Sequence, residues 1–187
     1  FPLAYGNQRP YAATWTVTGC GAVIISTKKG FAKITGITTG KIVDFGVKDA
    51  QNMGACMAPA AADTIAAHFS DFNLKPDHYD LIVTGDLGKI GQATAQDLLE
   101  QKGLKLKEGQ FRDCGLMLYK DDQNVQSGGS GAGCSATVLY GHLLNEMKKG
   151  TYKRILLAAT GALLSPLTVQ QNESIPCIAH AVSIEME

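Results

Sequence analysis

The chain has 187 residues, of which 45% are apolar and 18% are charged. This composition is typical of one globular domain and excludes a disordered tail. Because 17 Lys and Arg residues balance 17 Asp and Glu residues, no basic surface indicates nucleic acid as a partner. No apolar run approaches the roughly 20 residues that a membrane span needs. The chain begins at Phe1 rather than Met, and we expect it to be part of a longer protein.

The hydrophobic pattern predicts strands and helices that follow one another without a linker or a repeat. Strands are predicted over 15–26, 31–45, 79–84, 114–119, 154–160 and 175–184. Helices are predicted over 59–72, 90–102 and 135–149. Within these elements we expect residues 15–26 to be buried, 31–45 to bend at Gly36 and Gly40, and Pro59 to lie in the first turn of its helix. The order predicts an α/β fold with a mainly parallel sheet interior and antiparallel edges.

Five cysteines are spread along the chain, at Cys20, Cys56, Cys114, Cys134 and Cys177. Their number is odd and no two have the C-x-x-C spacing of many zinc and redox sites. We therefore expect reduced thiols, with neither a disulfide framework nor a structural metal.

Two predicted interior strands end in similar turns. Gly85 and Asp86 follow the strand over 79–84, and Gly161 follows the strand over 154–160. Ligands of open α/β sheets gather at the carboxyl ends of strands, so both turns are candidate walls of a site. The alternative is that each Gly only permits a tight exit from its strand.

The Gly-rich segment, residues 127–135, leads into a predicted helix and has the sequence Ser-Gly-Gly-Ser-Gly-Ala-Gly-Cys-Ser. Backbone N–H groups at such an entry suit a carboxylate, a phosphate or a thioester oxygen. The segment matches neither the P-loop pattern nor the G-x-S-x-G nucleophile pattern. The alternative to an anion cradle is close packing of the helix on the sheet.

Single reactive side chains allow two interpretations each. Asp86 either lies partly desolvated at the mouth of a pocket, or it forms an Asx turn or caps the helix that follows. Cys134 is more typical of a buried thiol than of a nucleophile, and His180 of a hydrogen-bonded core residue than of a base. We expect His68 and His142 to be packing or surface residues.

Five longer strings carry a family resemblance, at residues 80–87, 113–117, 127–136, 159–166 and 173–181. They resemble the stage V sporulation protein AD family over essentially the whole chain. That family is similar to the thiolase superfamily, whose fold has two similar α/β halves.

The resemblance implies that residues 1–30 are a remnant of the N-terminal half, including its last strand. Residues 31–187 would then form the C-terminal half, with a mixed five-stranded sheet flanked by helices. The missing N-terminal half and a second copy in a homodimer are the implied protein partners. We expect small side chains in the stretch from Ala58 to Ala67 to form part of an apolar face for such a partner.

The resemblance also implies that the acyl-condensing apparatus is dismantled. In condensing enzymes a His follows the strand matched here by 81–84, where this chain has Gly85 and Asp86. An Asn opens the loop matched by 128–130, where Gly129 and Ser130 stand. A third loop is matched by 161–165. We therefore expect no catalytic residue in this chain. The alternative is an acyltransferase or β-ketoacyl-synthase-like enzyme of unknown substrate, and a scaffold that only docks membrane proteins is a third possibility.

The family takes part in moving dipicolinic acid, usually with calcium, into the developing spore. The resemblance implies that this chain binds dipicolinic acid or its calcium chelate, with no resident cofactor or metal. The implied ligand-binding residues are Asp86, Gly129, Ser130, Gly161 and Ser165. Membrane proteins of the same spore transport system are implied partners, at the cytoplasmic face of the forespore inner membrane.

Overall fold

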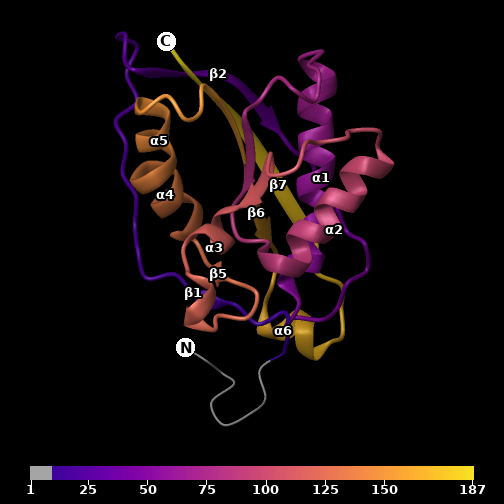
Figure 1. The fold of residues 1–187 in the computed structure, drawn as a ribbon. Helices are drawn as coiled ribbons and strands as arrows, with labels where there is room; N and C mark the ends of the chain where they lie inside the picture. Colours follow the sequence, from indigo (N-terminus) through magenta and orange to yellow (C-terminus); the bar gives the residue numbers. More distant parts are fainter. Residues whose placement is uncertain (1–9) are drawn as a thin grey trace.

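Five strands form one mixed sheet in the order β2-β7-β6-β3-β4 in the computed structural model, which describes residues 10–187 (Figure 1). These strands are β2 (Ala32–Thr39), β3 (Leu81–Thr84), β4 (Phe111–Asp113), β6 (Arg154–Ala162) and β7 (Cys177–Met186). β3 runs parallel to β4 and β6, whereas β7 runs antiparallel to β6 and β2. The predicted fold class, a mixed five-stranded α/β sheet flanked by helices, is confirmed.

Helices cover both faces of this sheet. α1 (Met53–Asp71) and α2 (Gly88–Gln101) lie on one face (Figure 1). The other face carries one helical stretch made of α4 (Cys134–Val138), a π-helical turn (Leu139–Leu143) and α5 (Leu144–Lys148). Two short helices, α3 (Cys114–Met117) and α6 (Pro166–Gln170), lie in the connections. None of the helices between residues 10 and 187 is long and apolar enough to cross a membrane.

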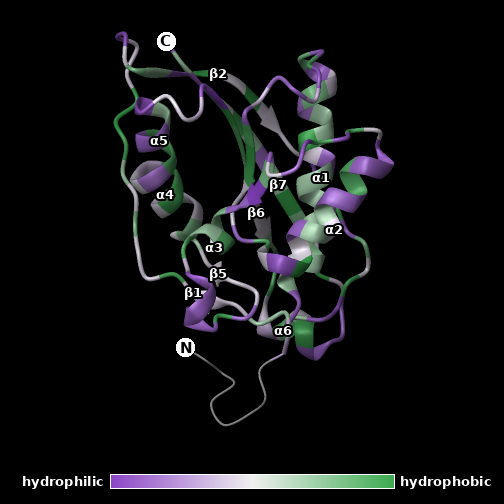
Figure 2. Ribbon diagram, in the orientation of Figure 1, coloured by the Kyte–Doolittle hydropathy of each residue, from purple (hydrophilic) through white to green (hydrophobic). Residues whose placement is uncertain are grey.

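Alternating side chains of the central strands divide the core into two layers. Leu81 and Val83 of β3 pack with the α4–α5 stretch, whereas Ile82 packs with α1 and α2. The central strands are correspondingly hydrophobic in Figure 2. This alternation follows from the two-residue period of a strand that is buried on both faces.

The Ala-rich segment of α1 faces the interior of this chain, which corrects the expectation that it offers a face to a missing partner. Ala58, Ala60, Ala61 and Ala62 have no exposed surface. At the crossing of α1 and α2, a Cβ on Gly54 or Gly91 would overlap the backbone of the other helix. Gly54 and Gly91 therefore permit the close contact between α1 and α2, and the alanines lie in the hydrophobic core.

The start of α1 also differs from the prediction. The side chain of Asn52 accepts a hydrogen bond from the Ala55 N–H at 3.3 Å and caps the helix. Pro59 consequently lies inside the helix rather than in its first turn.

Two predicted strands are wrong. Within 15–26 only β1 (Trp15–Thr16) is a strand. Among residues 10–187 it pairs with the two-residue β5 (Gly129–Ser130) alone, and residues 22–30 are exposed. Within 114–119 the chain forms α3, because the Asp113 side chain caps a helix there. The short α6 was not predicted. Of the predicted N-terminal loop, residues 1–9 lie outside the described residues.

The other predicted elements are present with shifted ends. The bend in β2 occurs at Gly36, where the pairing with β7 changes register. Gly40 follows the end of β2 instead of bending it. Gly103 and Gly150 have positive φ angles just after α2 and α5, as expected of glycines that end helices.

The segment that leads into β2 carries exposed apolar side chains. Ile24 and Ile25 are 93% and 75% exposed, and Phe31 is 40% exposed. Residues 23–34 line a groove of about 1120 Å³, called here the arm groove. Its other side is formed by residues of the α4–α5 stretch and of β7. The segment is coloured as hydrophobic along part of its course in Figure 2. An apolar surface of this kind is unusual for an isolated monomer.

A buried histidine ties α1 to the sheet. His68 has no exposed surface, its Nδ1 lies 2.8 Å from the Thr38 hydroxyl, and its Nε2 lies 2.6 Å from the Tyr79 hydroxyl. Burial lowers the pKa of His68, against an opposing contribution from Asp71. We expected His68 and His142 to be packing or surface residues. His68 is a packing residue, and His142 is exposed at the surface.

We predict that the arm groove makes this chain alone self-associate and bind an apolar dye. Replacing Ile24 and Ile25 by Ser should weaken both effects and change the free energy of unfolding by no more than about 0.5 kcal/mol, because both side chains are exposed. The control is Ile42→Ser, since Ile42 is 71% exposed outside the groove. Sedimentation and dye fluorescence measure the result. A dye-free monomer at high concentration would contradict it.

We predict that His68 makes the chain less stable in mild acid. Its folded pKa is lowered, so the unfolded chain binds the extra proton first as the pH falls below the ordinary pKa of about 6.5. The free energy of unfolding should therefore be unaffected by His68 above that pH. Below it, stability should fall by up to about 1.4 kcal/mol per pH unit until the folded pKa is reached. Urea unfolding of His68→Gln should lack this slope, whereas His142→Gln should keep it.

Candidate functional site

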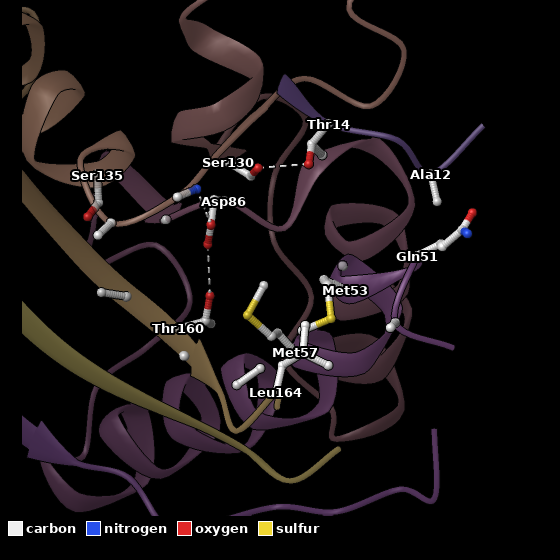
Figure 3. A pocket seen from close by; sticks show the side chains of 18 residues that line it. Ala12, Thr14, Gln51, Met53, Met57, Asp86, Ser130, Ser135, Thr160 and Leu164 are labelled. Carbon is white, nitrogen blue, oxygen red and sulfur yellow. Dashed lines mark hydrogen bonds between the residues drawn. The ribbon is translucent and has the colours of Figure 1, made fainter. Parts of the chain in front are cut away.

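A cavity of about 620 Å³ opens where the carboxyl ends of β3 and β6 meet (Figure 3). The two strands are parallel neighbours, with Thr84 paired to Ala158, so their ends lie at one edge of the sheet. The cavity, called here the strand-end cavity, is lined by Ala12, Thr14, Ala50, Gln51, Met53, Gly54, Met57, Gly85, Asp86, Ser130, Gly131, Ala132, Ser135, Ala159, Thr160, Gly161, Ala162 and Leu164.

Asp86 places its carboxylate at the polar wall of this cavity. Its Oδ2 accepts a hydrogen bond from the Gly131 N–H at 2.8 Å, and its Oδ1 accepts a longer one from the Thr160 hydroxyl at 3.4 Å. Burial raises the pKa of Asp86, and the hydrogen bond from Gly131 opposes that rise. Asp86 is also the only charged side chain among the described residues that line the cavity.

The alternative role of Asp86 as a helix cap is wrong, because Asp113 holds the start of α2. Asp113 is fully buried at the end of β4. Its carboxylate accepts hydrogen bonds from the N–H groups of Leu87, Gly88 and Gly115 at 2.8, 3.1 and 3.0 Å. The Thr84 hydroxyl donates a fourth, at 2.7 Å. Asp113 thereby fixes the turn that carries Asp86.

The Gly-rich segment is held by the N-terminal part of the chain. Trp15 pairs with Gly129 and Thr16 with Ser130 in the short parallel pair β1–β5. The Thr14 hydroxyl donates to the Ser130 hydroxyl at 2.8 Å (Figure 3). The Gly131 N–H, one of the groups expected to cradle an anion, donates to the protein's own Asp86.

The opposite wall of the cavity is apolar. Met53 and Met57 of α1 and Leu164 after β6 gather on the side facing Asp86 and Ser130 (Figure 3). The cavity therefore combines one wall of hydroxyl and carboxylate groups with one wall of thioether and aliphatic groups, the usual composition of a small-molecule site.

The structure brings together three of the five predicted site residues. Asp86, Ser130 and Gly161 line the strand-end cavity. Gly129 is buried behind it, where a Cβ would overlap the side chain of Val17. Ser165 caps α6, with its hydroxyl accepting from the Thr168 N–H at 3.2 Å, and does not line the cavity. No observation tests the binding role of any of the five, and the function proposed below uses only those that line the cavity.

Sequence reasoning missed Thr14, Thr160 and Asp113. Thr160 is the last residue of the strand predicted over 154–160, so its place beside Gly161 could have been recognised. Asp113 also carried a signal, because an Asp at the end of a short strand directly before a helix is typical of an N-cap. Thr14 lies 116 residues before Ser130 in the chain, and no local pattern joins them.

The cysteines and histidines of the chain supply no evident nucleophile and base at the cavity. Among the described residues, those that line the cavity include no Cys and no His. Cys134 is fully buried, as expected, and burial raises the pKa of its thiol to about 12. His180 is not a core residue, which corrects the expectation. It is exposed on β7, and its Nδ1 accepts from the Gly40 N–H at 3.2 Å. Residues 10–187 contain no group of three or more His, Cys, Asp or Glu side chains placed to hold a metal ion.

We predict that Asp113→Ala destabilises the fold strongly. Three buried N–H groups and one hydroxyl would lose their acceptor, and each such loss costs about 1–3 kcal/mol. The free energy of unfolding, measured with urea, should fall by at least ~3 kcal/mol. Asp113→Asn should lie between this variant and wild type, since one amide oxygen still accepts. The matched control is Asp97→Ala on the exposed surface of α2, which should change stability by no more than about 0.5 kcal/mol. Equal effects at the two positions would contradict the role of Asp113.

Two solved structures are similar to part of this fold. Human mitochondrial 3-ketoacyl-CoA thiolase matches 84% of this chain and 31% of its own chain, at 16% identity and a TM-score of 0.45. The 3-oxoacyl-[acyl-carrier-protein] synthase III of Aquifex aeolicus VF5 matches 86% of this chain and 46% of its own, at 12% identity and a TM-score of 0.47. These similarities concern the fold alone.

Sequence comparisons give a closer relationship. The family model for Stage V sporulation protein AD matches residues 1–185. Stage V sporulation protein AD of Bacillus subtilis (strain 168) is 49% identical over 185 residues, which cover 99% of this chain and 54% of the relative. The chain thus spans about half the length of that relative, and it belongs to the stage V sporulation protein AD family.

Proposed function

We propose that this chain is the C-terminal half of a non-catalytic sporulation protein, and that its strand-end cavity binds dipicolinic acid or the calcium chelate of that acid. Family membership supports the sporulation role. The observation that carries the ligand proposal is the cavity itself, whose polar wall of Asp86, Ser130 and Thr160 faces an apolar wall.

The cavity suits a small aromatic dicarboxylate in size and in chemistry. Its volume of about 620 Å³ lies within the range of roughly 300–1,000 Å³ that is usual for small-molecule sites. The pyridine ring would pack on Met53 and Met57, since thioether sulfur atoms make favourable contacts with aromatic rings. The carboxylates would face the hydroxyl groups of Ser130 and Ser135.

Ser130 is the best placed donor to a ligand carboxylate. Its oxygen already accepts a hydrogen bond from the Thr14 hydroxyl, which leaves its own proton to donate into the cavity. A hydrogen bond to a charged group contributes about 1.5–3 kcal/mol. Loss of this donor should therefore weaken binding by roughly 10- to 150-fold.

The sign of the charge in the cavity favours the calcium chelate over the free dianion. Asp86 is negative when ionised, and no Lys, Arg or His stands among the described residues of the lining. A bare dianion would be repelled by Asp86, whereas a calcium ion held by the ligand carboxylates accepts further oxygen ligands. Each oxygen of Asp86 accepts one hydrogen bond from the protein and keeps a lone pair for the cation. The calcium here is cargo bound with the ligand.

We further propose that the preceding half of the protein covers the arm groove, and that the protein works beside membrane proteins of the same transport system at the forespore inner membrane. The apolar side chains of Ile24, Ile25 and Phe31 support a covering partner. Family membership supports the setting in sporulation.

We predict that Ser130→Ala weakens calorimetric binding of dipicolinate to the full-length protein by roughly 10- to 150-fold. The matched control is Ser165→Ala, because Ser165 caps α6 outside the cavity, and it should bind as wild type does. Asp86→Asn should lose the enhancement by calcium and bind calcium-free dipicolinate at least as tightly as wild type, since the repelling charge is gone while an amide oxygen still accepts from Gly131. Equal affinities in Ser130→Ala and wild type would place the site elsewhere. Turnover of acyl thioesters well above the buffer rate would favour the acyltransferase alternative.

A further inference from the structure

Two buried cysteines from distant parts of the chain lie in contact behind the strand-end cavity. Cys56 lies in the first turn of α1 and Cys177 is the first residue of β7. Their Sγ atoms are 3.3 Å apart, and their side chains are 4% and 2% exposed. Each thiol also lies close to the Ile175 carbonyl oxygen, at 3.2 and 3.4 Å.

We propose that Cys56 and Cys177 are a redox modification site, at which a peroxide converts the two thiols into a reversible disulfide between α1 and β7. The two sulfur atoms must move only about 1.3 Å closer to reach the bond length of about 2.0 Å. Because the folded chain already holds them in contact, no further ordering of the backbone is needed to bring them together.

The reaction balances with hydrogen peroxide as the oxidant. One thiol, as its thiolate, attacks a peroxide oxygen, the O–O bond breaks, and a sulfenic acid and water result. The second thiol then displaces the sulfenic hydroxyl as water and forms the S–S bond. Two thiols lose two protons and two electrons in all, and one peroxide becomes two water molecules. A dithiol reductant reverses the step by thiol–disulfide exchange.

The connection over residues 41–51 is hydrogen-bonded to the backbone of Ile175 and Cys177. Val43 exchanges both backbone hydrogen bonds with Cys177, and the Ile175 N–H donates to the Val47 carbonyl at 2.9 Å. Most residues between 41 and 51 are otherwise exposed. Local opening of this connection would admit a small oxidant. Burial raises the pKa of the Cys177 thiol to about 12, so little thiolate forms at neutral pH and the exposed Cys20 should react earlier.

The position of the pair connects this chemistry to the cavity. Met53 and Met57, which form the apolar wall, flank Cys56 on α1. Ala162 of the cavity lining is the β6 partner of Cys177. A disulfide at this place would fix the α1 wall to the sheet wall of the cavity.

The test uses the full-length protein carrying Cys20→Ser, treated with hydrogen peroxide and analysed by peptide mapping. We expect a peptide pair joined through Cys56 and Cys177 and the loss of two free thiols. The thermal midpoint should rise by roughly 5–15 °C, because the crosslink joins residues 121 apart in the chain. Dithiothreitol should reverse all three changes.

Matched variants separate this pair from the other buried cysteines. Cys56→Ala and Cys177→Ala should each abolish the crosslink and the rise in thermal midpoint, whereas Cys114→Ala, at a fully buried position in the other core layer, should keep both. Comparing each variant with its own reduced form removes the cost of the substitution itself. Three results would overturn the proposal: a crosslink through other cysteines, irreversible oxidation of Cys56 or Cys177 to the sulfinic acid, or two free thiols at these positions after peroxide has consumed Cys20 in the parent protein.

Discussion

The buried carboxylate of Asp113 holds together the part of the fold from which the candidate site is built. It lies at the end of β4 and accepts four hydrogen bonds. One comes from the end of β3, two from the start of α2 and one from the start of α3. A buried carboxylate without a paired cation is tolerated only when donors satisfy it in this way. Because Leu87 and Gly88 are anchored, the preceding residue Asp86 cannot turn back to cap α2 and is directed toward the Gly-rich segment. The position of Asp86, the one charged group in the part of the lining that the structure describes, therefore depends on a residue outside the cavity.

The Gly-rich segment illustrates how one anion site can be filled from within the chain. Its Gly131 N–H binds the Asp86 carboxylate, so the anion that the sequence pattern led us to expect is the protein's own. Burial raises the pKa of Asp86 while this hydrogen bond lowers it. A negative ligand entering the cavity would have to compete with Asp86 for the donor or bring a cation that satisfies both carboxylates. If the proposed function holds, we expect the cavity to select its ligand by charge state as well as by shape.

The sequence predicted four of the five strands of the sheet, missing β4, and it predicted the site in part, for identifiable physical reasons. Strands β3 and β6 are short apolar runs ended by Gly, and their parallel pairing places Asp86 and Gly161 at one edge. Residues 15–26 were mistaken for a buried strand because their apolar content does not show how much of a neighbouring strand is there to pair with. The partner β5 has only two residues. Residues 114–119 were mistaken for a strand because they are apolar. The chain forms α3 there instead, since the Asp113 side chain caps a helix. The contact of Thr14 with Ser130 could not be predicted, since it depends on how β1 and β5 pair across 116 residues.

Each wall of the strand-end cavity is fixed from behind by a different interaction. Asp113 fixes the turn after β3, the β1–β5 pair fixes the Gly-rich segment, and the contact of Cys56 with Cys177 joins α1 to the start of β7. The first two of these interactions consist of directional hydrogen bonds. Of the residues that make the three interactions, only Ser130 lines the cavity. Substitutions in the lining can therefore change which ligand is bound while the walls keep their positions. A cavity whose walls are held from behind in this way is preformed, which is the condition for binding a small ligand without rearranging the chain.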